Sequence, residues 1–312
     1  MPPKRNVRRR LMLISVGVIG MMQASVAPAQ DASTYYTVMH PDEFEIDWTS
    51  FYRQAEQQTA GLRAELPHHL DLAYGEDPKQ RLDLYLPAGD PADAPVFLFL
   101  HGGGFQEGDR AQYGFVAGPF AEHGIVTAVA SYRLTVGGHT YPAQPEDVKS
   151  AIEWLYHHVA EYGGNPAAIF VGGHSAGAIL AADTGVDRSW LTDAGIPRDV
   201  LRGIVPISGA YDLRKSGRAY TPTPEAEAQA SPMLHIGDPV PAVVVAVGSV
   251  EETYLGSSRE FVEKLSGMRV SAQLLVLEGE NHRDTVASLA DGDSDLFRRV
   301  LEMIREYSRG NL

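Results

Sequence analysis

The sequence predicts an α/β fold in which helices cover both faces of a mostly parallel, doubly wound sheet. Three observations lead to this prediction. From Val96 onward, short apolar runs typical of buried strands alternate with amphipathic stretches typical of helices. Two alternating segments before Val96 suit an antiparallel hairpin at the start of the sheet. A Pro-rich segment at residues 209–240 interrupts the alternation, and it suits either a short cap or lid insertion or a plain surface loop.

Length and composition place the chain among ordinary globular proteins. Its 312 residues are 44% hydrophobic and 21% charged, and an open sheet of this size often forms one domain. The absence of cysteine excludes disulfides, a lipid-anchoring cysteine and thiolate metal sites. With 26 basic and 40 acidic residues the chain is strongly acidic, which argues against a nucleic-acid partner.

The first 29 residues read as a secretory signal peptide. Five basic residues precede the apolar run 11–22, and Ala27-Pro28-Ala29 has the small residues of a cleavage site. The apolar run is short for a bilayer span, so a permanent membrane anchor fits less well. Arg8-Arg9 suits a twin-arginine signal, and a Sec signal fits equally well. Cleavage near Ala29 removes five of the 26 basic residues and predicts a periplasmic or secreted protein of formal charge −19, without membrane association.

A helix is expected before the sheet begins. Asp47 suits its N-cap, apolar residues follow at helical spacing, and Pro67 ends it. Residues 30–66 are therefore expected to form an N-terminal tail and helix, and residues 67–312 the main domain. Within that domain, segments 68–74 and 80–86 alternate like half-buried strands and are joined by a turn signal, which predicts the hairpin.

The remaining elements alternate in βαβ order, which implies crossover connections between parallel strands. The expected strands are 96–100, 125–134, 168–172, 203–207, 242–247 and 272–277. The expected helices are 115–123, 145–162, one that begins at Ala176, 255–265 and 295–307.

Ser175 stands in Gly173-His174-Ser175-Ala176-Gly177, directly after an expected strand. A strand that ends in G-x-S-x-G forces its serine onto a sharp turn into a helix, and the flanking glycines leave room for the crossing. The pattern predicts an exposed nucleophile. A glycine pair around a serine also arises by chance in a chain with 31 glycines, so its neighbourhood must support the interpretation.

A second glycine-rich stretch, His101-Gly102-Gly103-Gly104-Phe105, follows the expected strand 96–100. Bare backbone at this place can direct N–H groups toward a carbonyl oxygen. A phosphate-binding loop is the alternative. The residues around these glycines match neither G-x-x-x-x-G-K nor G-x-G-x-x-G, so a phosphate loop fits poorly.

A serine nucleophile needs a general base and an acid that orients it, in the chain order Ser, acid, His. His282 is the only histidine after the expected strand 272–277, so it is the candidate base. Glu251 is the preferred acid, Glu252 is a close second, and Asp212 is a distant third. Each follows a strand end, and each could instead be an ordinary solvated carboxylate.

Other titratable residues suit structural roles. The pairs His68-His69 and His157-His158 are sequence neighbours whose side chains diverge, and H-E-x-x-H is absent, so no metal site is expected. Asp147 suits the start of a helix rather than catalysis.

These motifs resemble the α/β-hydrolase superfamily across essentially the whole mature chain. Within it, the stretches 130–134, 141–144 and 208–213, with Asn281-His282, resemble the serine carboxylesterase and arylformamidase-like group, near the hormone-sensitive-lipase-like esterases. The resemblance implies an oxyanion hole made by the backbone N–H groups of Gly103, Gly104 and Ala176, and it implies no cofactor. A glutamate acid departs from the commoner aspartate.

The motifs and the resemblance together predict an exported serine hydrolase of the carboxylesterase type. His282 would deprotonate Ser175, Glu251 would orient His282, and water would release an acyl group from Ser175. Short-chain or aryl esters are the expected small-molecule substrates, with Phe105 and Tyr211 in the pocket wall. Hydrolysis of N-formyl or aryl amides is the main alternative. A non-catalytic binding protein on the same scaffold fits less well, because binding alone has no use for a nucleophile and a base.

Overall fold

The computed structural model describes residues 46–89, 91–214, 220–237 and 239–308. The predicted signal peptide and the tail before Ile46 lie outside the described residues. By its internal contacts the chain divides into two units, residues 1–30 and residues 31–312. Every helix and strand named below belongs to the second unit.

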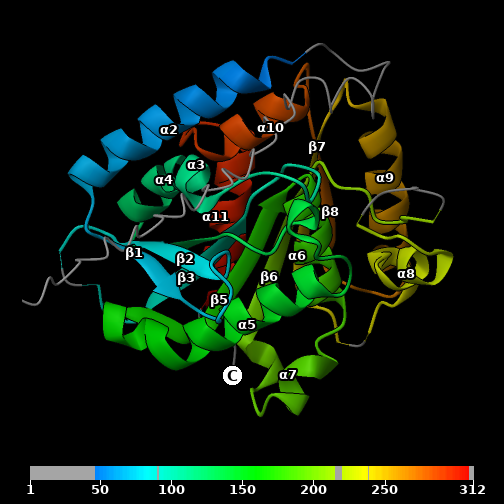
Figure 1. The fold of residues 1–312 in the computed structure, drawn as a ribbon, viewed down its shortest axis with the longest axis horizontal. Helices are drawn as coiled ribbons and strands as arrows, with labels where there is room; N and C mark the ends of the chain where they lie inside the picture. Colours follow the sequence, from blue (N-terminus) through cyan, green and yellow to red (C-terminus); the bar gives the residue numbers. More distant parts are fainter. Residues whose placement is uncertain (1–45, 90, 215–219, 238, 309–312) are drawn as a thin grey trace, which may run out of the picture. The chain divides into compact units, whose positions relative to one another are not determined.

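This unit is built on an eight-stranded sheet with the order β1-β2-β4-β3-β5-β6-β7-β8 (Figure 1). The strands are β1 His68–Ala73, β2 Arg81–Tyr85, β3 Ala94–Leu100, β4 Val126–Ala130, β5 Gly164–His174, β6 Leu201–Ile207, β7 Ala242–Gly248 and β8 Ala272–Leu277. β2 pairs antiparallel with β1 and β4, whereas the strands from β4 to β8 along the sheet are parallel. The predicted hairpin and the predicted doubly wound parallel sheet are therefore confirmed.

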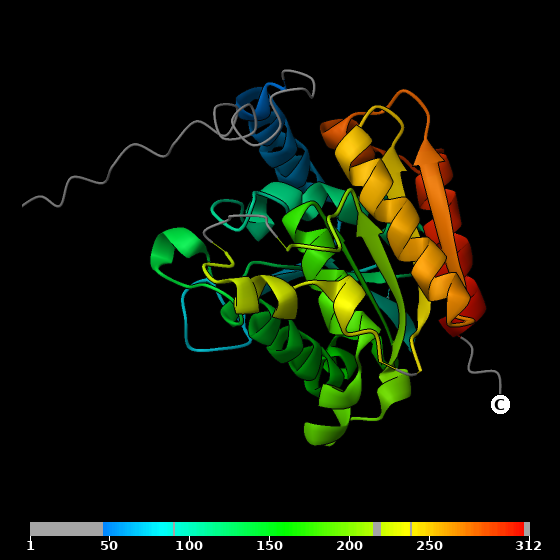
Figure 2. The same cartoon turned by 90° about the vertical axis from the view of Figure 1, so that its right-hand side faces the viewer.

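Helices cover the sheet on both faces (Figures 1 and 2). The α-helices are α2 Trp48–Glu65, α3 Arg110–Tyr113, α4 Ala117–Glu122, α5 Ala143–His158, α6 Ala176–Val186, α7 Ser189–Asp193, α8 Pro224–Gln229, α9 Glu252–Gly267, α10 His282–Leu289 and α11 Asp295–Ser308. Single 3₁₀ turns are η1 Gly114–Val116, η2 Thr135–Gly137, η3 Val159–Tyr162, η4 Arg198–Val200 and η5 Pro232–Leu234. None of the helices formed by described residues combines the length and the hydrophobicity that a membrane span requires.

β3 illustrates how the two faces are filled. Phe97 and Phe99 pack with residues of α2, α4 and α11, while Val96, Leu98 and Leu100 pack with residues of α5 and α6. All five side chains have 0% exposed surface. A strand buried on both faces reads as a continuous apolar run, which is the pattern the sequence shows here. Each such side chain contributes on the order of 2 kcal/mol by leaving water.

Some element boundaries differ from the sequence-based prediction. The expected strand 125–134 ends at Ala130, because beyond it the chain leaves the sheet after one bond from Ser131 to β2, and Tyr132 supports the glycine-rich stretch instead. β5 begins four residues earlier than expected. The short helices α7 and α10 were not predicted. The helix after Asp47 is confirmed: the Asp47 carboxylate accepts a hydrogen bond from the Ser50 N–H at 2.9 Å.

The described residues of the predicted insertion 209–240, which are 209–214, 220–237 and 239–240, contain α8 and η5, and η5 packs against α6. Nε2 of His235 lies 2.8 Å from Oδ1 of Asp183 on α6. The Tyr141 hydroxyl, just before α5, donates to the Gln229 carbonyl at 3.1 Å. These two contacts attach the segment to α6 and to the chain just before α5. That it covers bound substrate as a cap stays a prediction.

Candidate active site

Ser175 lies at a sharp turn between β5 and α6. Its φ of 57° and ψ of −115° are unusual for a residue other than glycine. A Cβ atom on Gly173 would lie 2.4 Å from the carbonyl oxygen of Gly177, and one on Gly177 would lie 2.2 Å from that of Leu100. Backbone therefore passes too close at both positions for any side chain, which explains the two glycines of the motif.

The glycine-rich loop after β3 lies beside Ser175. Gly103, Gly104 and Phe105 have φ values of 105°, 59° and 64°, so the loop coils through the left-handed region. A Cβ atom on Gly102 would lie only 3.3 Å from Cβ of Ser175. Within the described part of the chain, the N–H groups of Gly103 and Gly104 donate to no acceptor. Free backbone donors beside a nucleophile suit a developing oxyanion.

A third donor stands at the start of α6, which begins at Ala176 directly after Ser175. The first N–H groups of a helix have no acceptor within the helix, and the helix dipole adds partial positive charge there. The structure thus brings Ala176 to the same turn as the candidate nucleophile.

His101 fixes the base of the glycine-rich loop. Its ring has 0% exposed surface and stacks on Tyr132 with ring centroids 4.2 Å apart. Nδ1 lies 2.7 Å from the Gly102 carbonyl oxygen, so it carries the proton and donates. Burial lowers the pKa of His101 to about 4, which keeps the ring neutral near pH 7. The Tyr132 hydroxyl donates to the His101 carbonyl at 2.8 Å and ties the loop to the segment after β4.

A buried hydrogen bond joins His282 to Glu251. Nδ1 of His282 lies 2.5 Å from Oε1 of Glu251, and the two residues are only 2% and 1% exposed. An ionised carboxylate can only accept, so the Nδ1–H donates. In a neutral imidazole, this leaves Nε2 as the basic nitrogen.

Glu251 is the only one of the three candidate acids that contacts His282 among the described contacts. Its neighbour Glu252 is the exposed first residue of α9. Asp212 pairs with Arg214 at 2.5 Å, and hydrogen bonding to Arg214 lowers the pKa of Asp212. β5, β6 and β7 are parallel neighbours in the sheet (Figure 1). Ser175 follows the end of β5 and Glu251 follows the end of β7, so both lie at the carboxyl ends of strands, on the same side of the sheet.

Comparison with known proteins adds a family and several relatives. Residues 82–194 match the family model BD-FAE. The chain is 28% identical over 297 residues to Esterase LipC of Mycobacterium tuberculosis, covering 86% of this chain and 73% of that protein. It is 25% identical over 268 residues to a kynurenine formamidase of Salmo salar, covering 81% and 86% of the two chains. It is also 26% identical over 265 residues to a probable isoprenylcysteine alpha-carbonyl methylesterase of Arabidopsis thaliana, covering 75% of this chain but only 55% of that relative.

A solved structure agrees with these matches. Esterase Est2 of Thermogutta terrifontis, with propionate bound, superposes with a TM-score of 0.62 at 25% identity, covering 78% of this chain and 93% of its own. The chain has the α/β-hydrolase fold, and the relatives and the solved structure that it resembles include esterases. The structure thus combines the mostly parallel sheet, the sharp turn at Ser175 and the glycine-rich loop after β3 that the sequence predicts.

Aromatic rings surround His282 in this hydrolase. Tyr254 stacks on the imidazole with ring centroids 4.7 Å apart, and Trp48 of α2 meets it edge-on at 6.0 Å. His174 lies on a further side, with its centroid 4.5 Å away. The sequence analysis did not assign these three residues to the site. One signal was available: Tyr254 lies in the first turn of α9, three residues after Glu251, which is the N-cap of that helix.

The two residues expected in the pocket wall are both fully buried in the hydrolase. Phe105 stacks on Tyr220 with ring centroids 3.6 Å apart, so the glycine-rich loop packs directly on the insertion. Tyr211 stacks on Phe261 of α9 at 4.3 Å, within a core cluster that also contains Met233 of η5. Phe105 is thus next to the candidate oxyanion donors, and contact of either ring with substrate stays a prediction.

Asp147 has the structural role expected of it. Its carboxylate has 0% exposed surface, pairs with Arg133 at 2.6 Å, and accepts a hydrogen bond from the Gln80 side chain at 2.8 Å. A buried carboxylate held this way links α5 to the hairpin and has no part in the site.

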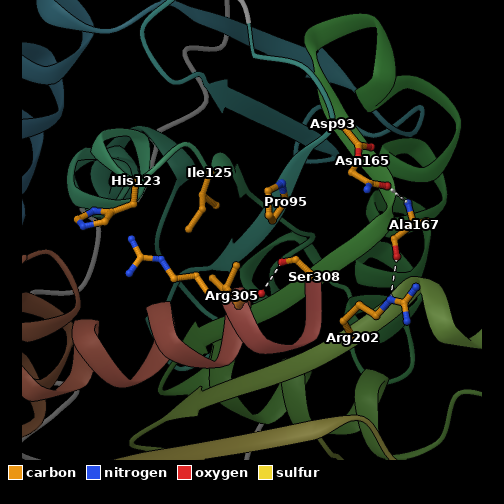
Figure 3. Close-up of a pocket in the computed structure, with 10 residues that line it drawn as sticks. Asp93, Pro95, His123, Ile125, Asn165, Ala167, Arg202, Arg305 and Ser308 are labelled. Atoms are coloured by element: carbon orange, nitrogen blue, oxygen red, sulfur yellow. Dashed lines mark hydrogen bonds between the residues drawn. The ribbon is translucent and has the colours of Figure 1, made fainter. Parts of the chain in front are cut away.

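A cavity of about 810 Å³ lies at the other edge of the sheet (Figure 3). Its lining includes Asp93, Asn165 and Arg202, which lie at the amino-terminal ends of β3, β5 and β6, with Arg305 from α11. Ligands of open parallel sheets bind beyond the carboxyl ends of the strands. This cavity is therefore separate from the site that contains Ser175.

Proposed function

We propose that this hydrolase cleaves carboxylic esters through an acyl-enzyme on Ser175. One observation carries the proposal: the buried hydrogen bond from His282 to Glu251, at the sheet edge where β5 delivers Ser175. Serine, glutamate and histidine follow in the chain order that an elbow after a parallel strand requires. The proposal places this chain among carboxylesterase-type serine hydrolases.

In the proposed mechanism, Nε2 of His282 takes the Ser175 proton while the serine oxygen attacks the ester carbonyl carbon. Glu251 stabilises the resulting imidazolium and keeps the proton of the neutral ring on Nδ1. Collapse of the tetrahedral intermediate breaks the bond to the alcohol, which leaves with the proton from His282. Water then attacks the acyl-enzyme with His282 as base, and the acid is released.

The tetrahedral oxyanion would be held by the N–H groups of Gly103, Gly104 and Ala176. Each such donor contributes about 3 kcal/mol of transition-state stabilisation in well-characterised acyl transfer. The left-handed path of the loop and the start of α6 support this assignment, because they present the donors without rearrangement.

Short-chain or aryl esters are the proposed substrates. Esterase LipC and the propionate-bound Est2 are similar to this chain and support an ester with a small acyl group. The kynurenine formamidase relative supports a second candidate, hydrolysis of N-formyl or aryl amides by the same residues. Parallel assays with p-nitrophenyl acetate, p-nitrophenyl butyrate and an N-formyl arylamine separate the two. Faster turnover of the formamide than of both esters would favour the amidase.

A fluorophosphonate probe tests the nucleophile directly. The wild-type protein should be labelled on Ser175, and Ser175→Ala should give neither label nor ester hydrolysis. Equal labelling of the variant, or no labelling of folded wild type, would contradict the proposal. Thr184→Val, which alters a buried hydroxyl elsewhere on α6, is the matched control and should label normally.

We also propose that the enzyme acts outside the cytoplasm, as the signal-like residues 1–29 suggest. Expression of the full chain in a bacterium followed by fractionation tests this. Mature protein beginning near Gln30 should accumulate in the periplasm or medium, and a full-length cytoplasmic product would contradict export.

A further inference from the structure

Ser208 is a buried serine in a conformation that serine rarely adopts. It follows β6 directly, has 0% exposed surface, and its φ is 54°. Its N–H donates to the Ala246 carbonyl at 2.8 Å, which fixes the turn against β7. Left-handed backbone at a residue other than glycine is retained where the surroundings demand it, and such positions cluster at functional sites. Glycine would suit this backbone better, so the serine side chain itself needs an explanation.

The Ser208 hydroxyl contacts the carboxylate that holds His282. Its Oγ lies 2.7 Å from Oε2 of Glu251 and 2.9 Å from Oγ1 of Thr285 on α10. A carboxylate has no proton to donate, so Ser208 donates to Glu251. Thr285 has a single hydroxyl proton, which it can donate either to Ser208 or to the His282 carbonyl oxygen at 3.2 Å. Hydrogen bonds in such a chain strengthen one another inside a protein.

Each oxygen of Glu251 thus has its own partner. Oε2 accepts from Ser208 and from the Gly248 N–H at 2.7 Å, and Oε1 faces Nδ1 of His282. Glutamate has one more rotatable bond than aspartate, and its terminal torsion is broadly distributed. Two donors on Oε2 fix that torsion and point Oε1 at the imidazole.

We propose that Ser208 is a positioning residue for the reaction: its hydroxyl locks the Glu251 carboxylate toward His282, and Thr285 supports it. This inference rests on the proposed function. It explains how a glutamate serves where aspartate is commoner, because the serine after β6 supplies the restraint that the longer side chain lacks. It also explains why the turn keeps a strained serine.

Ser208→Gly is the most informative variant, since it removes the hydroxyl and relieves the left-handed strain. We expect kcat for p-nitrophenyl acetate to fall about 10- to 100-fold, as for loss of a hydrogen bond to a charged group, with KM within about two-fold of wild type. Ser208→Ala should show the same loss despite its strained backbone. Thr285→Val should lose less, Thr285→Ser should restore wild-type kcat, and Thr184→Val should leave kcat unchanged.

A double-mutant cycle separates positioning from general damage. In a Glu251→Gln background, Ser208→Gly should cost less than about three-fold, because the carboxylate it holds is already gone. The downfield proton signal of the His282 Nδ1–H, measured by NMR, should shift or disappear in Ser208→Gly while the melting temperature stays near that of wild type.

The outcomes are distinguishable from those that test the nucleophile. Fluorophosphonate-labelled wild type with undiminished kcat in Ser208→Gly overturns the positioning role and leaves the proposed function intact. An equal loss from Ser208→Gly in both backgrounds also overturns it. Wild type that neither labels nor hydrolyses esters overturns the proposed function and the positioning role together.

Discussion

Nε2 of His174 lies 2.7 Å from the backbone carbonyl oxygen of His282, so the residue before Ser175 is tied to the first residue of α10. A carbonyl oxygen only accepts, so His174 carries its proton on Nε2. Burial and the neighbouring His282 lower the pKa of His174 to about 3, so its ring is neutral near pH 7. This bond fixes the loop that presents His282 relative to the turn that presents Ser175.

Replacement of His174 should therefore affect stability and catalysis together. His174→Phe keeps a ring of similar size but removes one of the hydrogen bonds to the His282 carbonyl, which still accepts from the Thr285 hydroxyl at 3.2 Å, so we expect a cost of about 0.5–1.5 kcal/mol of unfolding free energy. We expect kcat/KM to fall as well, because the two loops lose a direct connection. His174→Gln can still donate and should retain more of both quantities. Urea unfolding and ester hydrolysis measure them, and a His174→Phe enzyme equal to wild type would contradict this role.

Acid should destabilise the fold through its buried histidines. The folded-state pKa of His101, about 4, lies below the ordinary value of 6.5, so the unfolded chain binds more protons between these values. The stabilising contribution is fully present above pH 6.5 and is lost as pH falls toward 4. At pH 5 the loss is about 2 kcal/mol for this residue.

His101→Phe tests this pH dependence. Urea unfolding at pH 7 and pH 5 should show a decrease in unfolding free energy that is about 2 kcal/mol smaller in His101→Phe than in wild type. The exposed His157→Phe on α5 is the control and should follow wild type. Equal decreases in wild type and His101→Phe would exclude His101 as a source of acid sensitivity.

Much of the fold follows from hydrophobic period alone. Buried strands such as β3 read as continuous apolar runs, and α11 shows the helical period clearly, because each is decided by one local pattern. The expected strand 125–134 was too long because Ser131 and Tyr132 are buried for another reason. Ser131 is held by β2 and by Tyr74, since its N–H donates to the Arg81 carbonyl and its own carbonyl accepts from the Tyr74 hydroxyl. Tyr132 donates to the His101 carbonyl and supports the glycine-rich loop. A single sequence does not distinguish residues buried by loop contacts from residues buried in a strand of the sheet.

The residues of the candidate site also differ in whether a local sequence pattern could predict them. The glycines of the elbow, Gly173 and Gly177, form a recognisable motif because close backbone approach excludes any side chain at both positions. The partners of His282 come from distant elements, and no local pattern reports that Trp48 or Ser208 reaches this ring and its carboxylate. α10 was detectable: Asn281 accepts from the N–H of Asp284, whose side chain accepts from the Asn281 N–H, which is a capping box.

Neutralising Glu251 should nearly abolish catalysis without the same effect at Glu252. Glu251→Gln presents an amide to Nδ1, which favours the wrong imidazole tautomer and removes the charge that stabilises the imidazolium. A drop in kcat of about 10³- to 10⁴-fold is expected, as for the equivalent change in serine proteases. Glu252→Gln, on the exposed start of α9, should stay within about two-fold of wild type. Steady-state kinetics on one ester decide this, and a larger loss from Glu252→Gln would reverse the assignment.

Trp48 links the N-terminal helix to the active site. It is 5% exposed and packs against Phe51 and Tyr52 as well as His282. Trp48→Ala should lower the unfolding free energy by about 3–5 kcal/mol, as for other buried aromatic truncations. It should also lower kcat, because the imidazole of His282 loses the ring that packs against it. Trp48→Phe should preserve most of both. Trp154→Phe on α5 is the control, and a Trp48→Ala enzyme with normal kcat would show that α2 does not restrain His282.

The elbow geometry predicts opposite effects for two glycine-to-alanine changes. In Gly177→Ala the new Cβ would meet the Leu100 carbonyl oxygen at 2.2 Å, and both groups are fixed by the sheet and helix. We expect a loss of at least about 1–3 kcal/mol of unfolding free energy and a large fall in kcat, since Ser175 must move. Gly256→Ala, exposed within α9 with no atom within 4 Å of the new Cβ, should instead gain about 1 kcal/mol and leave kcat unchanged. Urea unfolding and ester hydrolysis of both variants provide the test. If Gly177→Ala proves as harmless as Gly256→Ala, the close approach of α6 to β3 at this turn is wrong.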